Sequence, residues 1–176
     1  MNRRKAMAAL SIAPLASAQR TPATRDRFNG VWKLVSCEST DKNSGQVRHP
    51  FGLKPVGRIT YDAAGRMSAQ LMDPGRRMVG GSPTRGSAGA IRDASPEDMR
   101  AMLTGFIAYF GTFDIDESAR TVIHHVRACL IPSWVGMDLR RSYEFQKDGR
   151  LVLTASGDPA VTRLVWQRDD GIGLEQ

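Results

Sequence analysis

Hydrophobic and polar residues alternate along most of this chain, and a period of two predicts β-strands. Trp32 and Leu34 share one face of the first alternating stretch, and Ile59 and Tyr61 share one face of a later stretch. Short turn sequences rich in Gly, Asn and Asp separate these stretches. The pattern predicts about nine strands, over residues 30–36, 46–49, 56–62, 66–72, 109–115, 121–131, 138–146, 151–155 and 163–167.

One segment has the helical period instead. Ser95 and Pro96 are typical of a helix start, with Ser as the N-cap and Pro at the first helical position. The apolar residues that follow predict one amphipathic helix that runs to about Ala108; they are Met99, Met102, Leu103, Phe106 and Ile107. The simplest interpretation of this stripe is core packing. The alternative is that it closes one end of a cavity, because methionine adapts to irregular ligands.

Many short strands with one helix between the fourth and the fifth favour a mainly β fold, a closed up-and-down antiparallel β-barrel. A β-sandwich is the alternative, although it gives the lone helix no role. Residues 73–94 follow neither period and contain five glycines and four arginines. A loop of this length is either a functional lid or a mobile insertion. The barrel domain is predicted over residues 30–168.

Two adjacent histidines mark the longest predicted strand. Because side chains alternate, His124 and His125 must lie on opposite faces. The more apolar face is expected to point inward; it comprises Val122, His124, Val126, Ala128 and Leu130. Cys129 and Ile131 are expected on the outer face with His125.

The two ends of the chain are predicted to lie outside the barrel. Residues 1–18 combine a basic start, a short apolar stretch and the small residues Ala16, Ser17 and Ala18, which is typical of an export signal cleaved after Ala18. An uncleaved basic tail is the alternative, and the protein would then be cytoplasmic. Residues 19–29 are interpreted as a polar lead-in and residues 169–176 as a flexible tail. Export predicts a periplasmic or secreted protein.

Charge and cysteine content narrow the function classes. The net charge of +7 would fall to +4 with the loss of Arg3, Arg4 and Lys5, and no basic block interleaves with aromatics, so nucleic acid is not an expected partner. No apolar run is long enough to span a bilayer. Cys37 and Cys129 have no metal-ligand spacing, and we expect two free thiols, although export would permit a disulfide. The sequence does not indicate an oligomeric state.

A series of short motifs resembles the microbial lipocalin-like domain family. Gly30-Val31-Trp32 is similar to the Gly-x-Trp signature of lipocalins, and Arg168 matches the late-strand arginine that packs on that tryptophan. Further matching segments lie, in order, at residues 50–52, 57–61, 67–71, 109–113, 124–126, 132–136 and 164–166. The resemblance spans residues 28–168 and implies a barrel of about eight to ten strands with an interior cavity. It implies no single activity, and residues 73–94 depart from the family pattern.

A barrel of this size holds one small ligand, bound by apolar walls and a few polar groups. Alternation predicts an apolar lining that consists of Trp32, Leu34, Ile59, Tyr61, Met67, Ala69, Leu71, Phe113 and Ile115. The polar candidates are His124, Arg141 and Tyr143, and Trp134 is expected at the rim. The predicted ligand-binding residues are therefore Trp32, Tyr61, Met67, Phe113, His124, Trp134, Arg141 and Tyr143.

Arg141 is the most informative of these candidates. A guanidinium that faces an apolar interior needs an acceptor, because an unpaired buried charge is costly. The acceptor could be an internal carboxylate, from Glu38 or Asp138, or a ligand carboxylate or enolate held with the help of Tyr143. The alternative is that the inner and outer faces of this strand are assigned the wrong way round by one residue, which would place Arg141 in solvent.

His124 has three interpretations: a hydrogen-bonded core histidine, a group that orients a ligand carbonyl, or a general acid/base. Catalysis would need a second group, for which Tyr61 or Tyr143 could serve. No Gly-x-Ser-x-Gly nucleophile motif and no phosphate-binding loop occurs. Neither a metal site nor a cofactor is expected.

Three hypotheses follow. The leading one is binding of a small hydrophobic ligand, which could be anionic, inside the barrel. The second is a cofactor-independent isomerase, cyclase or lyase on the same scaffold, with His124 and Tyr143 or Tyr61 as acid/base. The third is an interaction protein whose Gly/Arg-rich loop, residues 73–94, binds an acidic partner.

Overall fold

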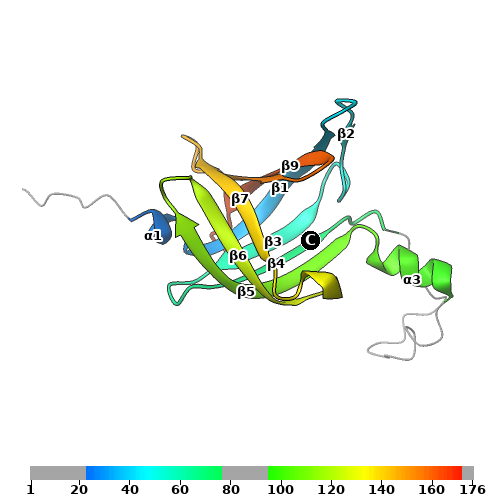
Figure 1. Cartoon of the computed structure of the whole chain (residues 1–176), viewed down its shortest axis with the longest axis horizontal. Coiled ribbons are helices and arrows are strands. Elements are labelled where there is room, and N and C mark those ends of the chain that lie inside the picture. Colours follow the sequence, from blue (N-terminus) through cyan, green and yellow to red (C-terminus); the bar gives the residue numbers. More distant parts are fainter. Residues whose placement is uncertain (1–22, 77–94, 172–176) are drawn as a thin grey trace, which may run out of the picture.

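The computed structural model of the chain describes residues 23–76 and 95–171, and these form one antiparallel β-barrel (Figure 1). Buried residues alternate with more exposed residues along β3, β4 and β5. The strands are β1 (Gly30–Asp41), β2 (Val47–Arg48), β3 (Val56–Tyr61), β4 (Arg66–Met72), β5 (Phe106–Asp116), β6 (Thr121–Cys129), β7 (Asp138–Phe145), β8 (Leu151–Ser156) and β9 (Ala160–Arg168). The helices are α1 (Thr24–Phe28), α3 (Pro96–Leu103) and the 3-10 turn η1 (Pro132–Trp134).

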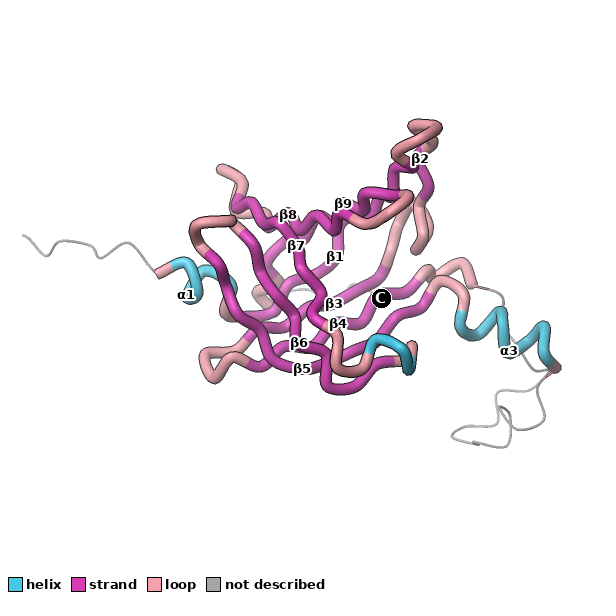
Figure 2. Tube along the Cα trace, viewed as in Figure 1, coloured by secondary structure: helices cyan, strands magenta, loops and turns pink. Residues whose placement is uncertain are grey.

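The barrel closes because β1 pairs with β9 along nearly its whole length, from Trp32 opposite Arg168 to Asp41 opposite Ala160. The sheet order is β2-β1-β3-β4-β5-β6-β7-β8-β9, so eight strands form the closed wall and the two-residue β2 is an addition to the edge of β1. Figure 2 shows how little of the described chain is helical. The predicted mainly β barrel, with one short helix between the fourth and fifth strands, is therefore confirmed.

Helix α1 closes one end of the barrel. The side chain of Phe28 is fully buried, with its ring centroid 5.2 Å from that of Tyr61 and 5.1 Å from that of Phe145. The Arg168 guanidinium packs over the Trp32 ring at 4.2 Å and donates to the backbone carbonyl of Asn29 at 2.6 Å. Residues 19–29 are predicted from sequence to be a polar lead-in, but Phe28 near the end of this segment is an apolar plug.

Gly30 explains the glycine of the Gly-x-Trp motif. Its φ of +124° lies in a region that residues with a side chain rarely adopt. A β-carbon at this position would also collide with the Arg168 guanidinium. Glycine therefore allows that arginine to cross the first strand and reach the carbonyl of Asn29.

Helix α3 is shorter than the sequence predicted. It ends at Leu103, Gly105 has a φ of +72°, and Phe106 begins β5, whereas the helical spacing had predicted a helix to about Ala108. The N-cap is as expected, because the Ser95 hydroxyl accepts from the Asp98 amide at 3.1 Å. Of the predicted stripe, Met99, Met102 and Leu103 do not pack in the core, since α3 has no buried residue, whereas Ile107 is buried in the core from β5. Within the described residues, no helix has the length and apolarity needed to cross a bilayer.

A β-bulge interrupts the alternation of β6. Gly111 of β5 faces Val126, but Phe110 faces Ala128, so Arg127 is the extra residue. A β-carbon on Gly111 would collide with the backbone carbonyl of His125, so only glycine permits this close approach of the two strands. Beyond the bulge, the residues of β6 therefore point to the faces opposite to those that the alternation predicted.

Cys129, opposite Tyr109, therefore packs against the core instead of facing outward. Ala128 lies opposite the exposed Phe110, and Leu130 is exposed, so the inward positions predicted for these two residues are wrong. The alternation held up to Val126, where the extra residue follows.

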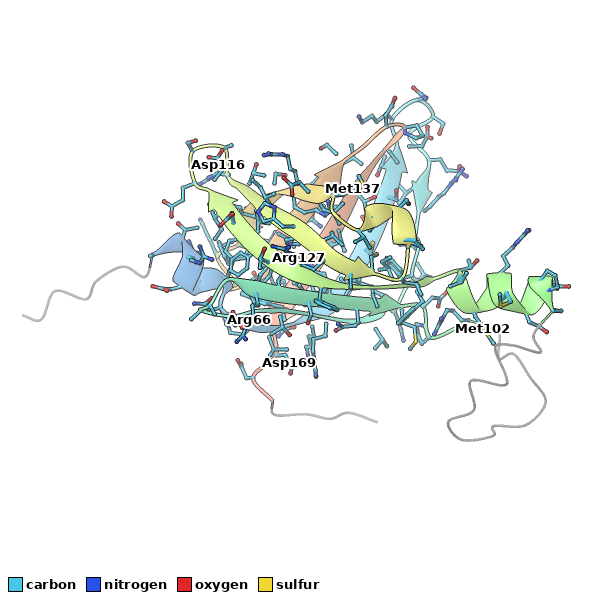
Figure 3. All side chains as sticks on the ribbon, turned by 60° about the horizontal axis from the view of Figure 1, so that its bottom comes forward. Arg66, Met102, Asp116, Arg127, Met137 and Asp169 are labelled. Atoms are coloured by element: carbon cyan, nitrogen blue, oxygen red, sulfur yellow. The ribbon has the colours of Figure 1, made fainter. Side chains whose placement is uncertain are left out.

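The export signal predicted for residues 1–18 and most of the loop predicted for residues 73–94 lie outside the described residues. The same is true of the C-terminal five residues of the predicted flexible tail. Figure 3 places Arg66 and Asp116 toward the end of the barrel that α1 closes, and Met102 on the helix at the opposite end.

Candidate functional site

The interior of the barrel contains most of the lining expected from the alternation. Met67, Phe113 and Trp32 are each at most 3% exposed, and Ile115 is half-buried against the same core. These side chains come from β1, β4 and β5, which lie in one half of the closed wall. The remaining predicted lining residues are buried with them: Leu34, Ile59, Tyr61, Ala69 and Leu71.

His124 is buried in this interior and is hydrogen-bonded at both ring nitrogens. The Tyr61 hydroxyl lies 2.8 Å from Nε2, and the Tyr109 hydroxyl lies 3.0 Å from Nδ1. The three side chains come from β3, β5 and β6, and all are buried. His124 is the single buried polar or charged residue of the described chain. The network therefore links three strands through one imidazole.

The protonation of this network is constrained by its surroundings. Burial, followed by the charges of Arg141 and then His125, lowers the pKa of His124 to about 3. A neutral imidazole has one N–H donor and one acceptor, so one tyrosine donates to His124 and the other accepts from it. Burial also raises the pKa of Tyr61 well above its usual value and raises the pKa of Tyr109. All three groups are neutral at pH 7.

Arg141 lies on the inner face of β7, at the same parity as the buried Leu139. Its charge acts on the pKa values of Tyr61, Tyr109 and His124, so the guanidinium interacts electrostatically with the histidine network. The side chain is half-buried and donates to the carbonyl of Arg140 at 3.0 Å.

Neither internal carboxylate that the sequence suggested neutralises Arg141. Glu38 is exposed, and Asp138 binds His125 on the outside of the barrel. Within residues 23–76 and 95–171, Arg141 forms no ion pair with a carboxylate. The inner face of β7 thus presents a cation without a counter-ion among the described residues.

Two other predicted site residues are in different surroundings. Tyr143 is on the inner face but packs its ring against Phe28, with the centroids 5.1 Å apart, and in the described structure its hydroxyl bonds neither His124 nor Arg141. Trp134 lies on η1, half-buried, with its ring centroid 6.4 Å from that of Tyr109. The tyrosine partners of His124 are therefore Tyr61 and Tyr109.

Sequence reasoning missed Tyr109 and Phe28. Tyr109 could have been found, because it has the same parity as Phe113 and Ile115 on one strand. Phe28 gave a weaker signal, a single aromatic residue after a short run of charged residues. The buried indole N–H of Trp166 is a further polar group that no pattern singled out, and it has no acceptor among the described residues.

On the outer face, His125 forms a separate cluster. Its Nδ1 lies 2.6 Å from Asp138 and its Nε2 lies 3.0 Å from Asp114. The hydrogen bond to Asp138, followed by the smaller effect of Asp114 against partial desolvation, raises the pKa of His125. This histidine therefore joins β5, β6 and β7 on the outside of the wall.

Both cysteines are free thiols in the structure. Cys37 is buried, and burial, with a smaller effect of the Glu38 charge, raises the pKa of its thiol to about 11. Among the described residues, no group of three or more His, Cys, Asp or Glu side chains is arranged to hold a metal ion.

Comparison with known proteins agrees with this architecture. A family model described as a lipocalin-like domain matches residues 29–169, which cover the barrel from its first strand to its last. Comparison with curated proteins gives no match.

Proposed function

Because this chain belongs to the lipocalin-like domain family, we propose that it binds a small hydrophobic molecule inside the barrel and that the molecule carries an anionic group. The fold supports binding in general terms. The observation that carries the finer proposal is Arg141, a cation on the inner wall without a carboxylate partner among the described residues. A ligand carboxylate or enolate would supply the missing counter-charge.

The histidine network supports a role in orienting the ligand. Neutral His124 accepts a hydrogen bond from one tyrosine and donates one to the other. The tyrosine that accepts keeps its own O–H, which is available to donate to a ligand oxygen. Tyr109 also interacts with the side chain of Arg141, so the guanidinium and the phenol could approach the same ligand group. The apolar walls would enclose the rest of the molecule.

Acid/base catalysis is less well supported. A general base works best with a pKa near the working pH, and the pKa of His124 is about 3. Both its nitrogens are already hydrogen-bonded to phenols, and Tyr143 is not one of these partners. The enzyme hypothesis is therefore secondary to ligand binding.

Binding of dodecanoate and dodecanol, measured by displacement of the dye 1-anilinonaphthalene-8-sulfonate, tests the proposal. Both compounds have the same tail, and only one has a carboxylate. We expect wild type to prefer dodecanoate by about ten-fold, since a charge-assisted hydrogen bond contributes about 1.5–3 kcal/mol. Arg141→Met should remove the preference and leave dodecanol binding unchanged.

Arg140→Met is the matched control, because Arg140 is the neighbouring arginine on the outer face of the same strand and is exposed. It should keep the wild-type preference. Native mass spectrometry of protein purified from its host adds an independent measurement, in which an anionic small molecule should accompany the barrel. Binding of neither compound, together with no co-purifying molecule, would contradict the proposal.

We also propose that residues 1–18 direct export, on the basis of their basic, apolar and small-residue order. The intact mass of the protein recovered from the periplasm and the medium tests this. A chain that begins at Gln19 is the expected result, and a full-length chain confined to the cytoplasm is the contrary one.

A further inference from the structure

Large exposed hydrophobic side chains gather at one end of the barrel. The described residues include ten of them, and Phe110 lies apart from the others, on the outer wall of β5. The other nine lie at the end opposite α1, where β3 begins and where β4 and β6 end. We call them the apolar rim; they are Val47, Leu53, Val56, Met99, Leu103, Leu130, Ile131, Val135 and Met137.

The exposure of the apolar rim is large. Leu53 is 78% exposed, at the tip of the loop between β2 and β3, and Val135 is 51% exposed beside η1. Exposed apolar side chains are ordinary when they are scattered, but a cluster at one end of a molecule marks an interaction surface.

Cationic side chains accompany the apolar rim. Arg48, Lys54 and Arg100 are exposed, and each directly follows a member of the rim in sequence. Within the part of the chain that the structure describes, none of the three pairs with a carboxylate, and the Arg48 guanidinium bonds the side chain of Gln46. Their charges are thus available to an anionic surface.

Carboxylates also lie at this end of the barrel. Asp41 accepts from the amides of its own turn, Asp73 accepts from the Gly75 amide, and Asp138 binds His125. Asp158 is exposed at the same end, in the turn between β8 and β9. Glu97 and Asp98 also lie on α3, directly before Met99, and all these carboxylates keep their charge. Between Asp41 and Val56, by contrast, the chain carries Lys42, Arg48 and Lys54 and no carboxylate, so the excess of positive charge lies on the β2 hairpin and the loop that follows it.

The arrangement of the rim indicates the kind of partner. Its members lie on separate projections, the β2 hairpin, α3 and the loop that contains η1, which extend from one end of the barrel (Figure 1). Separate apolar tips with adjacent cations suit a soft surface that each tip enters independently. Such pairs of residues are favoured at a lipid interface, where the apolar group inserts and the cation meets the headgroups.

We propose that the apolar rim docks this end of the barrel onto the surface of an anionic phospholipid bilayer. Apolar side chains would enter the boundary between headgroups and acyl chains, and Arg48, Lys54 and Arg100 would contact lipid phosphates. In this orientation the barrel end opposite the Phe28 plug faces the membrane, from which a hydrophobic molecule could enter. Docking does not depend on the proposed ligand binding, and each can fail alone.

Vesicle co-sedimentation of the full chain tests this proposal. The two vesicle types are phosphatidylcholine alone and phosphatidylcholine with about 30 mol% phosphatidylglycerol. We expect binding to the anionic vesicles that is at least about ten-fold tighter than to the neutral ones and that weakens with salt. Equal or absent binding to the two vesicle types would overturn the proposal.

Substitutions distinguish binding through the apolar rim from nonspecific hydrophobic adsorption to the vesicles. The double variant Leu53→Ser with Val135→Ser should weaken binding to anionic vesicles by about ten-fold or more, because two apolar insertions are lost. Phe110→Ser is the matched control, since it removes an apolar side chain that is 56% exposed but lies on the outer wall. It should bind as wild type does, and an equal loss in both variants would overturn the proposal.

Charge is tested in the same way. Lys54→Gln should weaken binding to the anionic vesicles, whereas Lys147→Gln, in the exposed turn between β7 and β8 near the opposite end, should not.

Sedimentation velocity without lipid tests whether a second copy of the chain binds the apolar rim instead of a membrane. A concentration-dependent dimer that the double rim variant abolishes, without vesicle binding, would assign the rim to a second copy and overturn the proposal. Dodecanoate affinity should be unchanged in the rim variants.

Discussion

The Tyr61 hydroxyl lies 2.8 Å from Nε2 of His124, inside a barrel where both side chains are 1% exposed. A second phenol, from Tyr109, completes the pair at Nδ1. Because these residues come from three different strands, their hydrogen bonds place polar groups inside the barrel and also hold the three strands in position relative to one another. Its ionisation and its hydrogen bonds give two separate predictions.

The first prediction concerns acid. The pKa of His124 is about 3 in the folded chain, which is below its ordinary value, so at mildly acidic pH the unfolded chain binds a proton that the folded chain does not. The stability that depends on this group is at its maximum above the ordinary histidine pKa. As the pH falls below that value, the free energy of unfolding decreases by about 1.4 kcal/mol per pH unit. Urea denaturation between about pH 6 and pH 5 should show this slope, and His124→Gln should remove it.

His125→Gln is the control for that experiment. The pKa of His125 is raised in the folded state, so its contribution to stability is complete below the ordinary histidine pKa and is lost as pH rises through the folded value. The variant should therefore keep the acid slope and lose less than about 1 kcal/mol near neutral pH, as expected of an exposed ion pair. An unchanged slope in His124→Gln would contradict the prediction.

Removal of either phenol should destabilise the barrel. Tyr61→Phe or Tyr109→Phe leaves one buried nitrogen of His124 without a partner, at a cost of about 1–3 kcal/mol in the free energy of unfolding. Tyr143→Phe should cost much less, because within the described structure the Tyr143 hydroxyl has no side-chain partner. Denaturant titration measures all three, and equal losses would show that the network does not act as described.

Gly111 should not tolerate a methyl group. In Gly111→Ala the new β-carbon would meet the His125 carbonyl, so the bulged strands must separate, and we expect a loss of more than about 2 kcal/mol. Gly157→Ala is the control, since the corresponding β-carbon would lie 3.5 Å from the Ala160 carbonyl, an ordinary contact. Thermal denaturation of the two variants measures the difference, and similar midpoints would contradict the close approach.

The plug at the α1 end gives a further prediction. Phe28→Ala should lower the free energy of unfolding by about 3–5 kcal/mol, because the ring is fully buried among four other aromatic side chains. Phe110→Ala removes an exposed ring and should change it by at most about 0.5 kcal/mol. A small effect of Phe28→Ala would mean that α1 does not close the barrel.

The alternation of apolar and polar side chains predicted the barrel well, because a strand with one buried face must have apolar residues at every second position. It placed Tyr61 and Phe113 inside, and these residues do line the interior. The helical spacing after Ser95 was misleading from Thr104 onward. Ile107 and Tyr109 are two residues apart and equally consistent with a strand, and Gly105 allows the chain to change conformation there.

The candidate site was only partly predictable. Parity placed His124 and Arg141 on inner faces, but distances between strands depend on register, which sequence does not provide. For that reason the sequence suggests Tyr61 or Tyr143 as the partner of His124, and Tyr109 is not among the candidates. Sequence could not show either that Arg141 lacks a carboxylate partner among the described residues, because Asp138, the neighbouring carboxylate in sequence, lies on the other side of the wall.

The extra residue on β6 also bears on how this strand can change in length. Arg127 is the residue that faces no partner, so a chain without it would join Val126 directly to Ala128 in unbroken alternation. Cys129 would still point inward, and the positions before it would be unaffected. A one-residue deletion elsewhere in the strand would invert every side chain beyond it. The bulge is therefore the point where the wall can lose a residue during evolution and keep the same interior.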